Sequence, residues 1–359
     1  MSTITIPNAR RWRAGVSAAL LTAALFGTAA CSTVGGDTTV TGDSTYMVAA
    51  KEGPLRIGFS NSFAGNAFRT QLIAELQYAA DNRPEDVAEL TITDANNSVD
   101  TQLSQINDLL TKGVDVLMID AASATALNGA VKRAWQQGVL VVSFDNEVTS
   151  EHGIVVNIDQ EEFGQVGGEW LAEKLNQGDS LVTLDGAAGS PVNDSRLLGA
   201  TGPIEEAGIS IVGQANTDWD QAKGQSAASN LLSAHPDING IYSQGGAASL
   251  GAINAIEQRG GELIPITGEG YNGFLKKWKQ LKDASNWESI APSAPPSLAA
   301  DALEIAIKAM RGEDPGRTPY VELPVITQDN LEEYVRPDLS DALFLPTGLP
   351  EDILMEMYG

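Results

Sequence analysis

The chain has 359 residues, of which 43% are hydrophobic and 36 are glycine, a size and composition typical of a globular protein with two domains. Its formal net charge of -25 disfavours binding to nucleic acid or to anions and favours a neutral or cationic ligand. The lone cysteine, Cys31, and the two histidines, His152 and His235, exclude an intrachain disulfide and a Cys/His zinc site. We expect neither a metal nor a cofactor, because no calcium loop of the Asp-x-Asp-x-Asp-Gly type occurs either.

Residues 1–30 predict an export signal. Arg10, Arg11 and Arg13 form a basic start, and Ala14–Ala30 follows as an uncharged run of small and apolar residues. A transmembrane helix is the alternative, but a run of this length that is rich in Ala, Gly and Thr is short and weakly apolar for a span.

Cys31 follows Ala29-Ala30 directly, which resembles the lipobox of bacterial lipoproteins, although Thr28 stands where Leu is preferred. We therefore expect Cys31 to be lipidated, with an Ala-x-Ala-like cleavage and a free thiol as the alternative. Residues 31–53 are rich in Gly, Thr and Ser and predict a flexible tether. The protein would then lie outside the cytoplasm, anchored to the cell membrane.

Beyond this segment, short apolar runs alternate with segments of helical periodicity. The apolar runs predict strands at Leu55–Ser60, Leu90–Asp94, Val114–Asp120, Val139–Asp145, Ile154–Ile158, Leu181–Leu184, Ile209–Gly213, Gly240–Ser243 and Ile264–Thr267. The periodic segments predict helices at Asn66–Ala80, Asp100–Leu110 (with Asp100 as its cap), Thr125–Gln137, Glu161–Asn176, Asp194–Glu206, Gln221–Ser233, Ser249–Gln258 and Phe274–Leu281. This alternation indicates parallel sheets with helices on both faces, and the number of strands favours two similar lobes.

Two segments of the chain are similar to each other. Val116–Val131 and Ile241–Ile253 each contain a strand followed by a turn of small residues. Two lobes with equivalent strand-to-helix turns would produce this similarity, and chance is the alternative.

Polar side chains follow the predicted strands, at the sheet edge where open parallel sheets bind their ligands. They are Asn61, Asn66, Asp94, Asn96, Asp120, Asp145, Asn146, Asp185, Asn193, Arg196, Asn216, Trp219, Gln244, Glu269 and Asn272. With Phe68 and Trp219 as flat partners, this mixture suits a sugar, because planar polar groups bind vicinal hydroxyls and an aromatic face covers the C–H side of the ring. Each residue alone could equally cap a helix or turn the chain.

Six short motifs occur in order along the chain. They are Gly65-Asn66-Ala67-Phe68-Arg69, Gly113-Val114-Asp115-Val116-Leu117, Phe144-Asp145-Asn146, Gly189-Ser190-Pro191-Val192-Asn193, Asp218-Trp219-Asp220 and Ala234-His235-Pro236-Asp237. Over roughly Leu55–Leu323 the chain thereby resembles the type I periplasmic sugar-binding proteins, the ribose-, galactose- and xylose-binding proteins of ABC importers. His235 falls at a helix end and is expected to be structural.

The resemblance implies an α/β fold of two doubly wound parallel-sheet lobes, joined by three crossovers near Asn157, Ala291 and Pro319. The implied domains are 54–157 plus 291–318 and 158–290 plus 319–345, with 346–359 as a tail. Together with the strand-end positions, the resemblance implies ligand contacts from Asn66, Phe68, Arg69, Asp120, Asp145, Asn146, Asn193, Arg196, Trp219, Gln244, Glu269 and Asn272. We assign no function to Thr327–Gly359.

Three departures from the ribose-binding members disfavour ribose itself. Gly245-Gly246 replaces Asn-Asp, Gly268-Glu269-Gly270 replaces Gly-Phe-Asp, and Arg69 replaces an aromatic residue. The missing side chains are expected to leave room in the second lobe for another small polyol.

The resemblance implies a monomer that closes around a monosaccharide or sugar alcohol and delivers it to an ABC permease. A receptor domain for a chemoreceptor or sensor kinase is the first alternative, because it needs the same closing lobes. A secreted hydrolase is the second, with Asp120 and Asp145 as its carboxylate pair. We expect no enzyme, since the chain has no Gly-x-Ser-x-Gly elbow, no phosphate loop and no Cys beyond Cys31.

Overall fold

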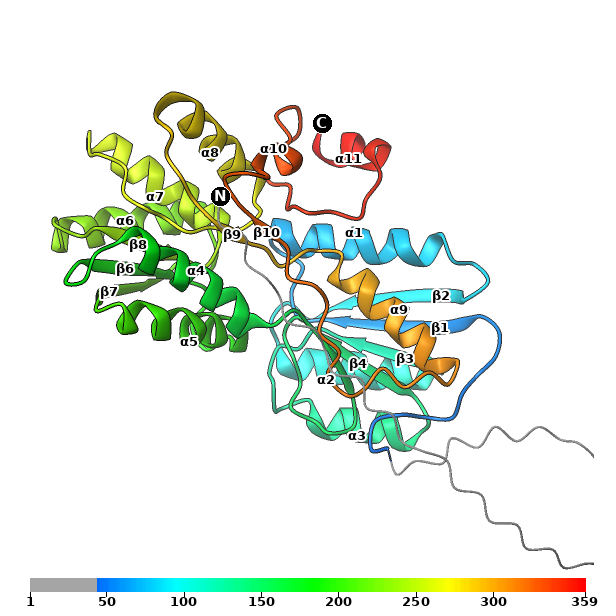
Figure 1. Cartoon of the computed structure of the whole chain (residues 1–359). Helices are drawn as coiled ribbons and strands as arrows, with labels where there is room; N and C mark the ends of the chain where they lie inside the picture. The colour runs from blue at the N-terminus through cyan, green and yellow to red at the C-terminus, as the bar shows by residue number, and fades with distance from the viewer. Residues whose placement is uncertain (1–43) are drawn as a thin grey trace, which may run out of the picture. The chain divides into compact units, whose positions relative to one another are not determined.

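The computed structural model describes residues 44–359, so the predicted export signal and Cys31 lie outside the described residues. Two parallel sheets, each covered by helices on both faces, confirm the predicted α/β fold with two lobes (Figure 1). The domain boundaries given above stay predictions.

The first lobe is built on a five-stranded parallel sheet with the order β2-β1-β3-β4-β5. Its strands are β1 (Leu55–Asn61), β2 (Val87–Asp94), β3 (Val116–Ile119), β4 (Leu140–Phe144) and β5 (Ile154–Val156). Its helices are α1 (Ala67–Asp81), α2 (Val99–Lys112), α3 (Asn128–Gln136) and α9 (Leu298–Met310).

Side chains of successive residues in these strands point to opposite faces of the sheet, and both faces are apolar. In β3, Val116 and Met118 join the core beneath α1 and α9, whereas Leu117 and Ile119 join the core beneath α2 and α3. This double burial explains why the strand appears in the sequence as a continuous apolar run.

The chain just before β1 belongs to the first lobe. Met47 is buried, the indole Nε1 of Trp135 donates to the Met47 carbonyl at 2.9 Å, and Lys51 N donates to the Met310 carbonyl at 2.8 Å. Residues 44–53, expected to be part of a flexible tether, are therefore held to the lobe by apolar packing and backbone hydrogen bonds.

The second lobe is built on a three-stranded parallel sheet with the order β7-β6-β8. Its strands are β6 (Ser180–Asp185), β7 (Ser210–Asn216) and β8 (Gly240–Ser243). Its helices are α4 (Gln160–Lys174), α5 (Pro191–Glu206), α6 (Gln221–Ala234), α7 (Gly246–Gln258) and α8 (Asn272–Ser285). The predicted strand Ile264–Thr267 is reduced to a single parallel bridge between Ile241 and Ile266.

Three stretches of chain lie together between the two sheets. Asn157 makes a parallel bridge with Tyr320, and β9 (Ala291–Pro292) pairs antiparallel with β10 (Val325–Ile326). The predicted crossovers fall close to these pairings. Each of these pairings involves only one or two residues of each strand, so only thin segments of chain connect the two lobes.

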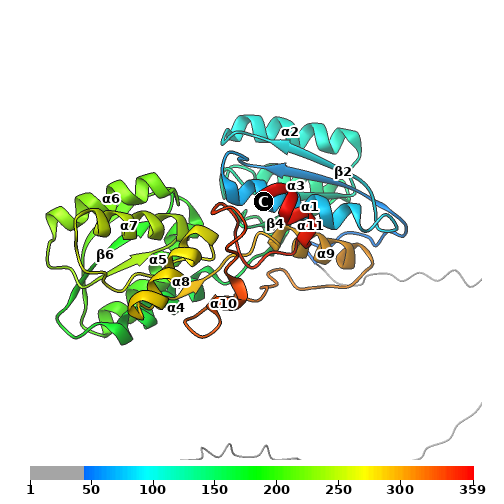
Figure 2. The ribbon, with the colours of Figure 1, turned by 90° about the horizontal axis from the view of Figure 1, so that it is seen from above.

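The C-terminal part of the chain contains elements that the sequence did not predict. They are α9, β9, β10, α10 (Leu331–Tyr334) and α11 (Glu351–Tyr358). Figures 1 and 2 both place α11 beside α1. Among the described residues, no helix combines the length and the apolar character that a bilayer span requires.

One predicted cap differs from the structure. Helix α2 begins after Ser98, whose Oγ accepts from Thr101 N at 3.2 Å, and Asp100 instead lies in the first turn. There its negative charge still favours the helix N-terminus.

Candidate functional site

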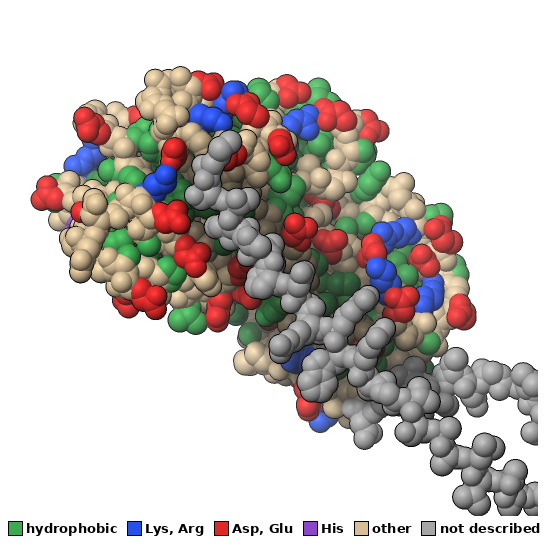
Figure 3. Space-filling view, in the orientation of Figure 1, with side chains coloured by type: hydrophobic (Ala, Val, Ile, Leu, Met, Phe, Trp, Pro, Cys, Tyr) green, Lys and Arg blue, Asp and Glu red, His purple; other side chains and the backbone are tan. Residues whose placement is uncertain are grey.

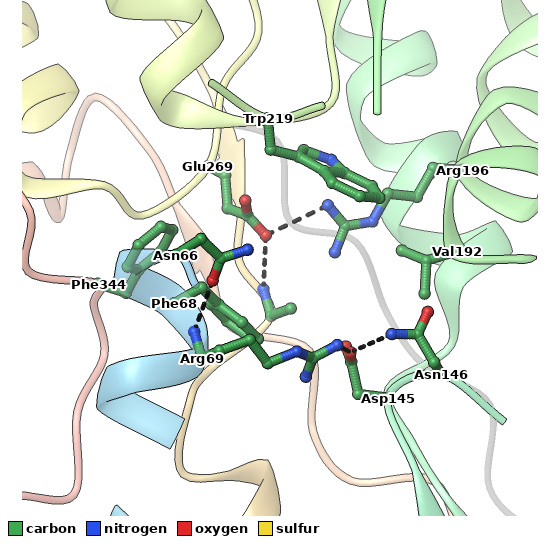
Figure 4. A pocket seen from close by; sticks show the side chains of 11 residues that line it. Asn66, Phe68, Arg69, Asp145, Asn146, Val192, Arg196, Trp219, Glu269 and Phe344 are labelled. Carbon is green, nitrogen blue, oxygen red and sulfur yellow. Dashed lines mark hydrogen bonds and ion pairs between the residues drawn. The ribbon is translucent and has the colours of Figure 1, made fainter. Parts of the chain in front are cut away.

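A cavity of about 90 Å³ lies between the two lobes (Figure 4). Its walls are formed by Asn66, Phe68, Arg69, Asp145, Asn146, Val192, Arg196, Trp219, Glu269, Ala294 and Phe344. Nearly all of these residues follow a strand or begin a helix, which is where a parallel sheet presents its ligand-binding edge.

Arg69 organises the wall that the first lobe provides. It lies in the first turn of α1, which Asn66 caps by accepting from Arg69 N at 2.8 Å. Its guanidinium Nη2 is 3.0 Å from Asp120 Oδ1 and also pairs with Asp145 Oδ2. Asp120 further accepts from the Asn146 side chain at 2.9 Å. The network fixes Arg69 and Asp145 at the cavity, with Asp120 fully buried behind them.

Arg196 organises the wall that the second lobe provides. Its Nε donates to Gln160 Oε1 at 2.8 Å, and its Nη1 donates to the Gln244 carbonyl at 2.9 Å and to Glu269 Oε1 at 3.2 Å. The guanidinium lies 3.6 Å from the centroid of the Phe163 ring, a cation–π contact. These contacts hold the side chain in one orientation.

Close packing of α4 against α5 makes this arrangement possible. A Cβ on Gly164 would overlap the carbonyl oxygen of Arg196, and a Cβ on Gly199 would overlap that of Glu161. The two glycines therefore let the helix backbones touch. This brings Gln160 of α4 within hydrogen-bonding distance of Arg196 in α5.

The indole of Trp219 is seated between two glycines. A Cβ on Gly186 would overlap the ring, and a Cβ on Gly245 would lie 2.7 Å from its Cδ1 atom. Trp219 itself adopts a left-handed backbone with φ of 54°, which is unusual for a bulky residue and costs conformational energy. Such strain is typical of functional sites.

The expectation that Gly245-Gly246 leaves room for a ligand is wrong. Trp219 fills the space beside Gly245, and a Cβ on Gly246 would overlap the carbonyl oxygen of Glu269. Protein atoms therefore occupy the space that side chains at positions 245 and 246 would need.

Two residues that line the cavity carry hydrogen-bond donors that no protein acceptor satisfies. Within residues 44–359, Arg69 Nη1 and Trp219 Nε1 are buried without a partner. Carboxylate oxygens of Asp145 and Glu269 supply acceptors in the same walls. Burial raises the pKa of Glu269, and the nearby Arg196 opposes that rise. Donors and acceptors side by side suit a ligand whose groups both donate and accept, as hydroxyls do.

The charges in and behind the cavity sum to -1 when all groups are ionised, because Arg69 and Arg196 face Asp120, Asp145 and Glu269. Asp and Glu side chains are also spread over both lobes on the face shown in Figure 3. This charge disfavours anions. Among the described residues, no group of three or more His, Cys, Asp or Glu side chains could hold a metal ion.

Not all of the predicted site residues line the cavity. Asn193 and Gln244 are buried next to it, and the Gln244 side chain donates to the Asn193 carbonyl at 3.2 Å. Of the further strand-end positions, Asp94, Asn96 and Asn216 are exposed. That Asn193 and Gln244 contact a ligand stays a prediction.

The assignment of Asn272 to the site requires correction. Its side-chain nitrogen donates to three backbone carbonyls between residues 336 and 340, and its Oδ1 accepts from Arg336 N at 2.9 Å. The amide is thus fully committed to the C-terminal part of the chain. Its position after a predicted strand could not reveal this, because the partner segment lies more than sixty residues away.

Three cavity residues were not predicted, namely Val192, Ala294 and Phe344. Val192 belongs to the motif Gly189-Ser190-Pro191-Val192-Asn193, but its apolar side chain gives no polar signal at a strand end. Ala294 lies in the proline-rich stretch after β9. Phe344 follows no predicted strand, so the strand-end rule could not have found it.

Comparison with known proteins agrees with this architecture. The family model of the periplasmic binding protein domain matches residues 57–314. The chain belongs to this family. Its resemblance to the type I periplasmic sugar-binding proteins is thereby confirmed.

Two curated relatives illustrate the family. The ribose import binding protein RbsB of Bacillus subtilis is 29% identical over 275 residues, which cover 76% of this chain and 87% of that protein. The xylitol-binding protein of Mycolicibacterium smegmatis is 24% identical over 267 residues, which cover 73% of this chain and 75% of that protein.

Among solved structures, an ABC transporter solute-binding protein from Bacillus halodurans with bound myo-inositol aligns with a TM-score of 0.70. The alignment covers 79% of this periplasmic binding protein and 98% of the other chain, at 22% identity. At this identity the likeness concerns the fold.

Proposed function

We propose that this protein captures a monosaccharide or sugar alcohol outside the cytoplasm and delivers it to an ABC importer. Support comes from family membership and from relatives named for ribose and xylitol. The observation that carries the proposal is the set of polar groups on the residues that line the cavity. Arg69 and Trp219, which line the cavity, each carry a buried donor without a protein partner, and Asp145 and Glu269 bring carboxylates to the same walls.

The walls belong to different lobes, so a bound solute would join them. Arg69 and Asp145 come from the first lobe, whereas Arg196, Trp219 and Glu269 come from the second. Only the closed arrangement offers both sets of contacts, so the solute stabilises it by its higher affinity for that form. Desolvated carboxylates and guanidinium groups make charge-assisted hydrogen bonds to hydroxyls, which are stronger than neutral ones.

Binding without catalysis is part of the proposal. The carboxylates considered for a hydrolase, Asp120 and Asp145, both pair with the same guanidinium nitrogen of Arg69, and Asp120 is fully buried. A glycosidase needs one carboxyl group that carries a proton and another that is free to act as nucleophile or base. This shared pairing favours a binding site.

We further infer that the mature chain begins at a lipidated Cys31 and acts as a monomer next to its permease. The support is the lone cysteine behind a run of small residues in the sequence. Mass spectrometry of the membrane fraction should detect a diacylglyceryl group on Cys31, and a Cys31→Ser variant should appear in the soluble fraction.

A ligand screen tests the proposed function. D-ribose, D-allose, xylitol and myo-inositol are added separately while the intrinsic tryptophan fluorescence, to which Trp219 contributes, and the melting temperature are recorded. One of them should shift the emission and raise the melting temperature, because a ligand stabilises the state that it binds. If none of the four, nor a wider set of pentoses, hexoses and sugar alcohols, changes either signal, the proposal is wrong.

Asp145→Ala tests the site itself. The variant should lose binding of the sugar found in the screen and remain folded, because Arg69 keeps its pair with Asp120. Asp94→Ala is a matched control, since Asp94 lies at the end of a strand of the first lobe but is exposed and does not line the cavity. Unchanged affinity in Asp145→Ala would remove this residue from the site.

A further inference from the structure

The C-terminal part of the chain lies outside the region that the family model matches, which ends at residue 314. We call residues 336–358 the C-terminal strap. Figures 1 and 2 show it passing from beside α10, near the second lobe, to α11, beside α1 of the first lobe. The strap therefore contacts both lobes, through Asn272 of the second and Gln71 of the first.

The second lobe holds the strap at the start of α8. Asn272 binds it through four hydrogen bonds of its side chain, as described above. Tyr271 makes an antiparallel bridge with Phe344, and Leu345 N donates to the Gly270 carbonyl at 2.6 Å. The backbone on both sides of Phe344 is thus fixed to this lobe.

The first lobe holds the same stretch through two buried side chains of α1. Gln71 donates from Nε2 to the Phe344 carbonyl at 3.0 Å and accepts from Phe344 N at 2.8 Å. Glu75 accepts from Thr347 Oγ1 at 2.8 Å and from Gly348 N at 2.9 Å. Gln71 satisfies both backbone groups of one residue, an arrangement that fixes its position closely.

These anchors place the Phe344 ring on the wall of the cavity. Its centroid lies 5.2 Å from that of Phe68 in the first lobe and 5.4 Å from that of Tyr271 in the second, both in edge-to-face geometry. Figure 4 shows Phe344 and Phe68 together on one side of the cavity, with Trp219 and Arg196 on another side.

We propose that Phe344 is a ligand-contacting residue that determines solute specificity, and that Gln71 acts as its positioning residue. The proposal rests on the proposed function and deepens it. The Phe344 ring is an apolar part of the cavity wall and lies with Phe68 on one side of the cavity. It therefore selects solutes that present C–H groups on that side and rejects those with an additional hydroxyl or carbon there.

The experiment compares full-length variants with the wild type against D-ribose, D-allose, xylitol and myo-inositol by titration calorimetry. Phe344→Ala should weaken binding of the preferred probe by about tenfold or more, because a buried aromatic contact is lost. The loss of affinity should be smaller for the six-carbon probes than for the five-carbon ones, because truncation of the side chain enlarges the cavity. Gln71→Ala should reduce affinity with the same change in selectivity, because the ring loses its fixed position.

Tyr334→Ala is the matched control. It truncates another half-buried aromatic residue in the C-terminal region that does not line the cavity, and its affinities should remain within about twofold of the wild type. If Phe344→Ala does not fold, Phe344→Leu keeps an apolar side chain of similar reach but lacks the aromatic face. Phe344→Leu should still reduce the affinity for the preferred probe.

Each outcome is decisive. A folded Phe344→Ala or Phe344→Leu variant with wild-type affinities and selectivity would overturn the role of Phe344 while leaving the proposed function intact. If the wild-type protein binds neither the four probes nor any of the wider set of pentoses, hexoses and sugar alcohols, the proposed function is wrong and this inference falls with it.

Discussion

Replacing Asp185 with asparagine should stabilise the protein at neutral pH. Asp185 ends β6 and is buried, with 5% of its surface exposed. Burial raises the pKa of this carboxyl from 3.8 to about 6, and a long hydrogen bond from the Gln244 side chain, at 3.5 Å, opposes that rise. The folded protein therefore favours the protonated form, and ionisation at neutral pH costs free energy.

The two pKa values differ by about two, which corresponds to a cost of about 3 kcal/mol at 1.36 kcal/mol per unit. Between pH 4 and pH 6 the folded state binds more protons than the unfolded state, so this contribution to stability falls as the pH rises. Well below pH 3.8 both states are protonated and the cost disappears. Asparagine carries no charge at any of these pH values and avoids the cost.

Urea unfolding of the wild type and Asp185→Asn at pH 4, 5, 6 and 7 measures this difference. The gain should be small at pH 4 and should grow to as much as about 3 kcal/mol at pH 7. Asp94→Asn is the control, because its carboxylate also ends a strand but is exposed, and it should show no such trend. A gain of the same size at pH 4 and pH 7 would refute the argument, since it would indicate packing instead of ionisation.

Two further substitutions test the walls of the site. Gly245→Ala places a Cβ 2.7 Å from the Trp219 ring, so it should cost roughly 1–3 kcal/mol and shift the tryptophan emission; an unchanged spectrum and stability would contradict the seating of the indole. Arg196→Met leaves the buried Glu269 without its cation and should cost roughly 3–5 kcal/mol in urea unfolding. Arg196→Met combined with Glu269→Gln should recover part of that loss, whereas additive losses would show that the two residues act independently.

Much of the fold could be predicted because its elements are encoded locally. A strand such as β3 alternates its side chains between two apolar cores, so its continuous apolar run indicates a parallel sheet without knowledge of any partner. The strand-end rule also located residues such as Asn66, Asp145 and Trp219, which line the cavity. The rule works because the carboxyl ends of parallel strands meet at one edge of the sheet.

The same rule failed where contacts depend on segments far apart in the chain. Asn272 stands after an apolar run as a ligand-binding residue would, yet its amide holds the C-terminal strap. The two glycines at 245–246 suggested open space, which the indole of Trp219 occupies instead. Periodicity and composition describe a residue's neighbours along the chain and cannot describe which distant side chain fills the space beside it.

By itself, the sequence determined the alternation of strands and helices, the two-lobed fold and the family, because all three depend on local patterns and ordered motifs. Only the tertiary structure decided that the C-terminal strap reaches the cavity and that Phe344 forms part of its wall. The reason is physical. The position of Phe344 depends on backbone hydrogen bonds to Gln71, which lies 273 residues earlier in the chain, and no local pattern records a contact of that range.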